Sequence, residues 1–322
     1  MEYSLNERIS PRGSEHLITP ICEFIIKENV SKKPGINPFK VYWPQGFFTF
    51  NTVNKKKRIA TVTDVKFIED DTIVVAHRAA ATLLLIKLVD DRFEVIDKIR
   101  LRLWWRGEGR FFHPDLIAVN GSRIYMTEYT ARVLVVDIID NKFRVVKHSC
   151  CGSIPFHGCF SDNQRLMLGA VEGLQVSVLN SELGLECSLH VESEEPDVRI
   201  KTVGVQDGIF FLGLDRHLGG VSTGWFNAYQ LVGNQLVLIH SLIFEDTQID
   251  GHVFNGQYHF VAMEPGGWDA GCIAAIAFDG TVLEVKERIK CESFPHGLDI
   301  RGDTLIYSSY ANSSVVKCRL AL

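Results

Sequence analysis

Histidines followed by carboxylates recur at a fixed distance in this sequence. His113 is followed by Glu128, and His157 by Glu172, and the members of each pair are 15 positions apart. Imidazole and carboxyl groups act as general acids and bases, and both also ligate transition metals. The recurrence therefore predicts a site at which several such groups meet.

These pairs belong to a longer repeat. Runs rich in β-forming residues begin again at positions 63, 113, 157, 202, 250 and 296, which gives a period of 44 to 50 residues. Within the units, dipeptides such as Asn120-Gly121 and Asp279-Gly280 are typical hairpin turns. Four strands per unit at such a period indicate a β-propeller. We therefore predict an all-β fold, a six-bladed β-propeller with four strands per blade.

The sixth unit ends one strand early, after the run at residues 315–320. A propeller that stays open exposes a sheet edge, so we expect a strand from the N-terminal side, within residues 47–62, to complete the last blade. Residues 46–322 then form the propeller. Residues 1–45 form an extension packed on the ring, in which residues 18–26 are a short helix or a strand.

First strands line the axis of a propeller, so the strand ends on one face should converge there. The first strands start at Thr63 or Asp64, His113, His157, Thr202, Asp250 and His296. A ring of such groups costs desolvation energy unless they are paired, hydrated or bound to a cation. Any one histidine can instead fix a loop by bonding to a neighbouring blade. The candidate catalytic residues are His77, His113, Glu128, His157, Glu172, Asp215, Glu264, His296 and Tyr310.

The order of the units predicts which groups face each other across the axis. In a sixfold ring His157 opposes His296, and His113 opposes Asp250 or His252. These five residues are candidate ligands of one divalent metal, for which imidazole and carboxylate favour Zn²⁺, Fe²⁺ or Mn²⁺ over Ca²⁺. Such a metal polarises a carbonyl or activates water. Without one, the same groups can act as acid and base, and the sequence leaves both possibilities open.

The long connections of the repeat fall on the same face as these strand ends. Long loops on a rigid scaffold commonly carry binding residues. The candidate substrate contacts on them are Trp104, Trp105, His217, Trp225, Trp268 and Asp269.

The overall composition and charge limit the classes of partner that this protein is expected to bind. A net charge of −5 argues against nucleic acid. No apolar run approaches the roughly 20 residues needed to span a bilayer, and the N-terminus lacks an export signal. The eight cysteines have no metal-type spacing and read as reduced core thiols. We expect a cytoplasmic protein whose partner is a small-molecule substrate or ligand, with no nucleic acid and no membrane.

One phrase resembles a known family. Phe294-Pro295-His296-Gly297-Leu298, followed by Leu305-Ile306-Tyr307, resembles the blade motif of the gluconolactonase, paraoxonase and strictosidine synthase-like six-bladed propellers, and it recurs loosely at residues 154–158. Calcium-dependent members of that group use Asn, Asp and Glu near the axis, where this chain has His157 and His296. Axial histidines are more similar to the peptidylglycine amidating lyase propeller, which holds zinc with three histidines from alternate blades. Here the histidines come from the second, third and sixth units.

Two functions follow as hypotheses. The first is an enzyme of hydrolase, lyase or isomerase type that acts on a small organic molecule in the axial cup, with or without a metal. The alternative is a non-catalytic binding propeller that presents loops to a protein or sequesters a ligand. The alternative predicts an exposed apolar patch around Trp104, Trp105 and Trp225.

Overall fold

The computed structural model describes residues 2–7, 17–27, 62–78, 80–89, 92–105, 108–128, 131–151, 156–162, 164–193, 197–218, 221–265, 271–291, 294–310 and 312–321. Every regular element in these ranges is a β-strand. Within the described part of the chain, no helix is long and apolar enough to cross a membrane.

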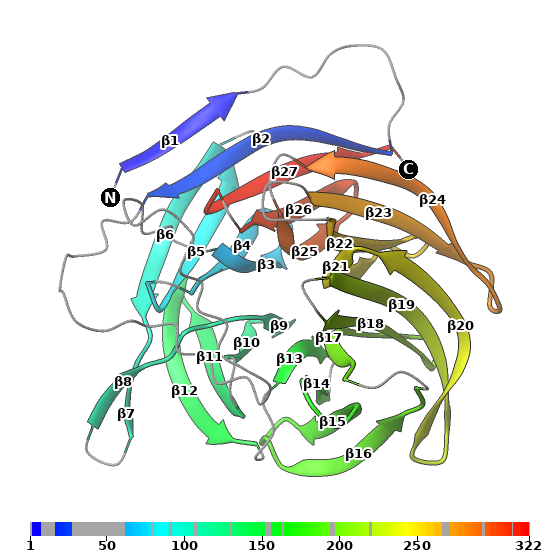
Figure 1. Ribbon diagram of the computed structural model, residues 1–322. Coiled ribbons are helices and arrows are strands. Elements are labelled where there is room, and N and C mark those ends of the chain that lie inside the picture. Colours follow the sequence, from blue (N-terminus) through cyan, green and yellow to red (C-terminus); the bar gives the residue numbers. More distant parts are fainter. Residues whose placement is uncertain are drawn as a thin grey trace.

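The described strands group into six antiparallel meanders, which we call blades 1 to 6 (Figure 1). A short parallel pairing of their outermost strands joins the third and fourth meanders into one sheet. Blade 1 contains β3 (Val62–Glu69), β4 (Thr72–His77), β5 (Thr82–Val89) and β6 (Arg92–Arg100). Blade 2 contains β9 (Ile117–Asn120), β10 (Arg123–Thr127), β11 (Arg132–Ile139) and β12 (Lys142–Cys150). Blade 3 contains β13 (Phe156–Ser161), β14 (Arg165–Ala170), β15 (Gln175–Asn180) and β16 (Leu185–Val191).

The second half repeats the pattern. Blade 4 contains β17 (Arg199–Gln206), β18 (Ile209–Leu218), β19 (Val221–Val232) and β20 (Gln235–Glu245). Blade 5 contains β21 (Thr247–Phe254), β22 (His259–Pro265), β23 (Gly271–Phe278) and β24 (Leu283–Cys291). Blade 6 contains β25 (Pro295–Arg301), β26 (Thr304–Ser309) and β27 (Ser314–Leu320), continued by β2 (Ile18–Lys27) and β1 (Glu2–Glu7). A separate hairpin, β7 (Arg102–Trp105) and β8 (Glu108–Phe111), joins blades 1 and 2.

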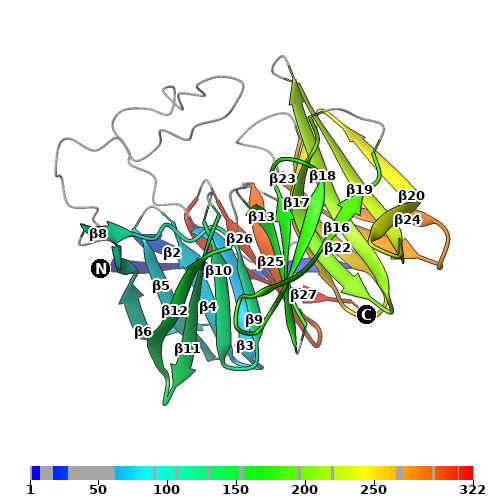
Figure 2. The same ribbon diagram turned by 90° about the horizontal axis from the view of Figure 1, so that it is seen from below.

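The blades close into a ring. The first strand of each blade lies nearest the centre in Figure 1, and Figure 2 shows the same ring turned by 90°. Six apolar clusters hold it together, and each lies between two neighbouring blades, including one between blades 6 and 1. The sequence explains this packing, because strands covered on both faces are almost continuously apolar, as in β4 and β5, whereas the outer strands alternate, as in β24. The predicted all-β, four-stranded propeller fold is confirmed.

The strand that completes blade 6 comes from the N-terminal side, as predicted, but from a different segment. β2 pairs antiparallel with β27, from Ile18 opposite Leu320 to Ile25 opposite Ser314. The expectation that residues 47–62 supply this strand is wrong, because β2 occupies the position next to β27, and Val62 begins β3. Residues 47–61 lie outside the described residues. β2 suits this position because Ile18 is buried in the cluster between blades 5 and 6, and Phe24 in the cluster between blades 6 and 1. Residues 18–27 therefore belong to the ring.

Replacing Phe24 by Ala tests this closure. Phe24 stacks on Phe93 of blade 1, with ring centroids 5.1 Å apart, within the cluster between blades 6 and 1. We expect Phe24→Ala to lower the free energy of unfolding by about 3–5 kcal/mol, as for other buried aromatic-to-alanine changes. Denaturant unfolding measures the loss, with the exposed Leu185→Ala as control. A Phe24→Ala protein as stable as wild type contradicts the closure by β2.

Candidate functional site

In five blades the first strand contains an extra residue near the same end, and in blade 2 the extra residue lies just before that strand. The pairing with the second strand shifts register at Val62/Asp64, Phe156/Gly158, Ile200/Thr202, Ile249/Gly251 and Pro295/Leu298. In blade 2, the Asp115 amide donates to the Thr127 carbonyl and the Thr127 amide donates to the Leu116 carbonyl, so two residues again face one. Such β-bulges redirect a side chain out of the normal strand alternation.

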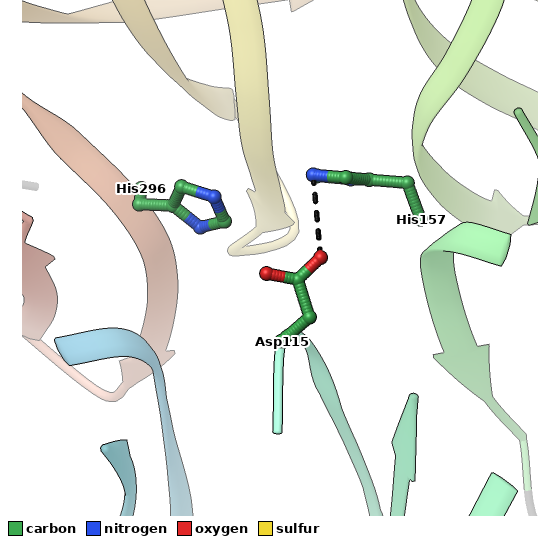
Figure 3. Close-up of side chains that lie close together, drawn as sticks. All are labelled: Asp115, His157 and His296. Atoms are coloured by element: carbon green, nitrogen blue, oxygen red, sulfur yellow. Dashed lines mark ion pairs between the residues drawn. The ribbon is translucent and has the colours of Figure 1, made fainter. Parts of the chain in front are cut away.

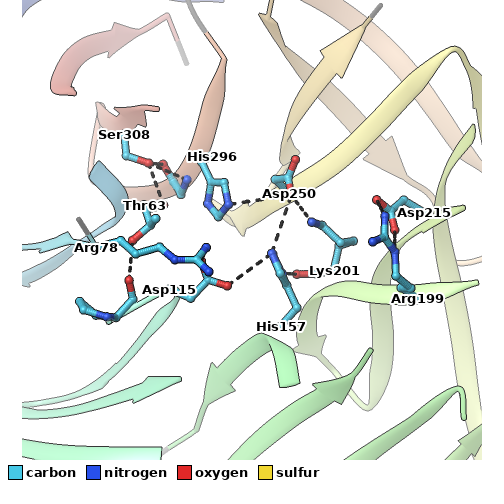
Figure 4. A network of polar contacts seen from close by, with 12 residues as sticks. Thr63, Arg78, Asp115, His157, Arg199, Lys201, Asp215, Asp250, His296 and Ser308 are labelled. Atoms are coloured by element: carbon cyan, nitrogen blue, oxygen red, sulfur yellow. Dashed lines mark hydrogen bonds and ion pairs between the residues drawn. The ribbon is translucent and has the colours of Figure 1, made fainter. Parts of the chain in front are cut away.

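The bulged positions bring six side chains to the axis, one from each blade. They are Thr63, Asp115, His157, Lys201, Asp250 and His296, and all six are buried. We call them the axial cluster. Figure 4 shows them with their polar neighbours at the centre of the ring.

The charged members of the axial cluster are close to one another. Lys201 Nζ lies 2.6 Å from Asp250 Oδ1. His157 Nε2 lies 3.6 Å from Asp115 Oδ2 and 3.9 Å from Asp250 Oδ1. His296 Nε2 also lies 3.9 Å from Asp250 Oδ1. Burial by itself raises the pKa of Asp250, but the Lys201 ammonium and His296 outweigh it and hold that pKa below the ordinary value.

His157 is held as a neutral imidazole with one defined tautomer. Its Nδ1 lies 2.9 Å from the Lys201 carbonyl oxygen, and because a carbonyl only accepts, Nδ1 carries the proton. Burial, and then the neighbouring Lys201 charge, lower the pKa of His157 well below its ordinary value. The Nε2 lone pair therefore points toward the carboxylates of Asp115 and Asp250.

Several atoms at this point have no hydrogen-bond partner among the described residues. They are Asp115 Oδ2, Asp250 Oδ2 and His296 Nδ1, all of them buried. Figure 3 shows Asp115, His157 and His296 approaching one another from three blades. One potential ligand atom from each of these three residues lies within 4.8 Å of the other two.

Ion pairs surround the axial cluster. Arg78 Nη1 lies 3.0 Å from Asp115 Oδ1, and Arg199 holds Asp215 through two bonds of 2.8 and 2.7 Å. Glu128 pairs with Arg132. Burial, together with the negative charges of Asp250 and Asp215, raises the pKa of Glu264 to about 8. Glu264 is therefore largely protonated at neutral pH.

The structure brings together three of the predicted ligands, His157, Asp250 and His296. His113 is not among them. Its Nδ1 lies 2.9 Å from the Arg78 carbonyl oxygen, which links blade 2 to blade 1, and Asp115 occupies its expected place at the axis. Lys201 likewise takes the place expected for Thr202. At both places the axial residue differs from the one that the comparison of the six repeat units predicted, because the bulge changes the register of the strand.

His252 lies apart from the axial cluster. Its Nε2 is 2.9 Å from His259 Nδ1, and its ring packs near Phe211 and Phe226 between blades 4 and 5. Burial lowers the pKa of His252 well below its ordinary value and lowers that of His259 to about 4. His252 follows the bulged residue by two positions, so its side chain enters the apolar layer between blades.

The other predicted catalytic residues divide into two groups. Tyr310 stacks on His296, with ring centroids 5.4 Å apart, and Asp215, Glu128 and Glu264 are buried at the predicted strand ends. By contrast, Glu172 is exposed between β14 and β15, and His77 Nδ1 accepts a bond from the Ala80 amide and fixes the turn after β4.

The predicted substrate contacts are less well placed. His217 Nδ1 lies 2.9 Å from Ser222 Oγ within the β18–β19 hairpin. Trp225 is buried in the cluster between blades 3 and 4. The side chains of Trp104 and Trp105, and all of Trp268 and Asp269, lie outside the described residues.

Sequence reasoning missed Asp115, Lys201, Arg78 and Arg199. Asp115 carries a usable signal, because it follows His113-Pro114 at the start of a unit. Lys201 has none, since a lysine in a strand usually faces solvent.

The comparisons with known proteins support a β-propeller. No protein-family model and no curated protein matches the sequence. Among solved structures, the chain is similar to U3-55K and to the WD40 repeats of RRP9, each at 11% identity and a TM-score of 0.57, covering 82% of this chain and 97% and 96% of theirs. It is also similar to the WD40 β-propeller domain of Doa1, at 10% identity and a TM-score of 0.51, covering 80% of this chain and 92% of that one. At such identities the likeness concerns the fold alone.

Glu264 predicts a measurable pH dependence of stability. Its folded-state pKa of about 8 exceeds the ordinary 4.5, so the folded protein binds this proton more tightly than the unfolded chain. The corresponding stability is complete below the ordinary pKa and is lost as the pH rises to the folded-state value. Glu264→Gln, which cannot ionise, should gain on the order of 2–4 kcal/mol relative to wild type between about pH 5 and pH 9.

Denaturant unfolding at the two pH values measures this difference. Glu284→Gln, at an exposed position of β24, serves as the control and should follow wild type at both. If Glu264→Gln and wild type differ equally at both pH values, Glu264 is not the buried acid described here.

Proposed function

We propose that the axial cluster is a metal-assisted active site for a small organic molecule, with chemistry of the hydrolase, lyase or isomerase type. The observation that carries the proposal is the set of lone pairs that meet there. The Nε2 lone pair of neutral His157 faces a carboxylate oxygen of Asp115, and buried His296 Nδ1 has no hydrogen-bond partner among the described residues. Lone pairs that face one another in a dry site repel, and a cation between them removes the repulsion.

The donor set fits a transition metal. Asp115, His157 and His296 offer two imidazoles and one carboxylate, a combination that suits Zn²⁺, Fe²⁺ or Mn²⁺ and leaves coordination positions open. Ligand atoms about 2.1 Å from a tetrahedral ion lie about 3.4 Å from one another, close to the 3.6 Å between His157 Nε2 and Asp115 Oδ2. The contacts behind the ligands fit as well. The Lys201 carbonyl fixes the His157 tautomer, and Arg78 orients Asp115.

The surrounding groups give this site chemical options. A divalent metal in such a site polarises a carbonyl or lowers the pKa of a bound water. Protonated Glu264 is a candidate proton donor, and Lys201 keeps Asp250 ionised beside both histidines. The phenol of Tyr310, stacked on His296, is a further polar group at the mouth.

The resemblance to the gluconolactonase, paraoxonase and strictosidine synthase-like propellers is consistent with this proposal, since it implies an axial site. The alternative is a non-catalytic binding propeller. This alternative predicts an exposed apolar patch that includes Trp225, but Trp225 is buried. The exposed side chains of Val221 and Ile243, toward one end of the outer strands of blade 4, are the observation that favours it. The experiment below separates the two.

The first test is metal binding by the full chain. We expect about one equivalent of Zn²⁺, Mn²⁺ or Fe²⁺ per chain by elemental analysis and calorimetry. Asp115→Asn and the double variant His157→Ala/His296→Ala should each weaken binding by more than about 100-fold, because each removes a direct ligand. The matched control is His148→Ala/His190→Ala, which removes two histidines from the outer strands β12 and β16.

Asp115→Asn keeps the size of the side chain and guards against loss of fold, which circular dichroism monitors. A wild-type protein that binds none of the three ions contradicts the metal centre. Turnover is then measured on lactone and ester panels with metal-loaded and chelated protein. Metal binding without turnover on any substrate class favours the binding alternative.

A further inference from the structure

A cavity lies between blades 4 and 5, at the end of the ring opposite the axial cluster. It has a volume of about 270 Å³ and is formed by the β17–β18, β21–β22 and β23–β24 turns. The bulges of these two blades lie near the start of the first strand, and the β17–β18 and β21–β22 turns join the far ends of the same strands. Pockets for drug-sized ligands span about 300–1,000 Å³, so this cavity suits a smaller molecule.

Aromatic rings line the cavity. They belong to Phe211, Phe254, His259 and Phe278. The His259 ring contacts both Phe211 and Phe254, with ring centroids 4.0 and 4.6 Å away. The ring of Phe278 stands nearly perpendicular to that of Phe211, at 5.3 Å and 84°. Phe211 is buried, whereas Phe254 and Phe278 are partly exposed, so their rings are within reach of a ligand.

The His259 ring is fixed and uncharged. Its Nδ1 lies 2.9 Å from His252 Nε2, and because both rings are neutral, one of these atoms donates and the other accepts. Burial lowers the pKa of His259 to about 4 and that of His252 well below its ordinary value. At neutral pH, His259 therefore adds a π system to the cavity and no positive charge.

The polar groups around the rings are electron-rich. Asp207 lines the cavity, is exposed, and has no ion-pair partner among the described residues. The side-chain amide nitrogens of Gln206 and Gln257 donate to Asp207 Oδ2 and to the Tyr258 hydroxyl, which leaves their amide oxygens as acceptors. None of the described residues that line the cavity is Lys or Arg. The cavity therefore combines aromatic rings with a single negative charge.

We propose that this cavity binds a small organic cation, namely an ammonium group that carries alkyl substituents. The quadrupole of an aromatic ring attracts a cation to its face, most strongly where water is excluded. Alkyl groups weaken the hydration of the nitrogen, so such a cation enters an aromatic cavity at a lower desolvation cost than Na⁺ does. Asp207 supplies the opposite charge at the edge of the cavity. The site goes beyond the proposed function, because it includes no residue of the axial cluster.

The test uses the full chain with choline as the probe, at constant ionic strength. Its matched control is the neutral alcohol in which a tert-butyl group replaces the trimethylammonium group. We expect choline to bind by calorimetry and to raise the melting temperature, and the neutral alcohol to bind about tenfold more weakly or not at all. Failure of choline to bind overturns the proposal. Equal binding of the neutral alcohol also overturns it, because the cavity is then merely apolar.

An aromatic variant locates the binding. Phe278→Leu keeps an apolar side chain but removes one ring, and it should weaken choline binding about threefold or more. Its control is Phe143→Leu, at a partly buried aromatic residue packed against the cluster between blades 1 and 2, which should bind as wild type does. Circular dichroism checks that both variants fold. Equal losses in the two variants contradict a site at Phe278.

A charge variant tests the role of the carboxylate. Asp207→Asn should weaken choline binding about twofold to fivefold, the effect of one solvent-exposed charge. The control Asp140→Asn removes the same charge from the β11–β12 turn of blade 2, at a similar backbone angle, since φ is 49° at Asp207 and 51° at Asp140. A loss as large in the control shows attraction by overall charge and overturns the proposal.

A last variant separates this site from the proposed metal centre. Asp115→Asn removes a direct ligand of the proposed metal, and it should bind choline as wild type does. If Asp115→Asn loses choline binding, the cation binds among the axial carboxylates and the proposed cavity is wrong. A protein that binds choline at the cavity but no metal keeps this site and loses the metal centre.

Discussion

The β-bulge at the start of each inner strand is the constraint on which the centre of this molecule depends. A regular strand places alternate side chains in the two apolar layers between blades, where no charged group is tolerated without a partner. One extra residue breaks that alternation and turns a single side chain toward the axis. Because the ring repeats the device in every blade, six polar side chains meet without disturbing the six apolar clusters that hold the blades together.

Burying so many ionisable groups at one point is possible because their charges are arranged in pairs and layers. Lys201 compensates Asp250, and Arg78 compensates Asp115, so neither carboxylate is a lone buried charge. His157 stays neutral, and the backbone carbonyl of Lys201 sets the direction of its Nε2 lone pair. The blades are thus joined at the axis by polar contacts, whereas apolar side chains join them further out.

The architecture could be predicted from the sequence because each repeat unit has a recognisable pattern of residue types. Turn dipeptides and β-rich runs recur with the period of a blade, and they identified the units without any three-dimensional information. The closing strand was harder to find. Both residues 18–27 and residues 47–62 are apolar enough for a strand, and only packing against Phe93 and β27 favours the first.

The candidate site was predicted in part, for a physical reason. His157, Asp250 and His296 were placed correctly because each is both the polar residue at a unit start and the bulged residue. His113 and Thr202 were assigned to the axis, where the structure has Asp115 and Lys201. A bulge depends on how two strands pair, so it cannot be recognised from the alternation of polar and apolar residues within one strand. The arginine partners depend on contacts between segments, such as Arg78 with Asp115 across 37 residues.

The pairing of β2 with β27 also shapes how the chain reaches its native state. Ser314 Oγ donates to Glu23 Oε1 across 291 residues of sequence, so this contact joins segments made at very different times during synthesis. β2 is translated before any of the blades, whereas its partner strand β27 is translated after the other five blades. Loop closure over such a distance carries a large entropy cost, and folds rich in non-local strand pairing form slowly. Blade 6 therefore closes only once β27 has been made, and until then β2 lacks its partner in the ring.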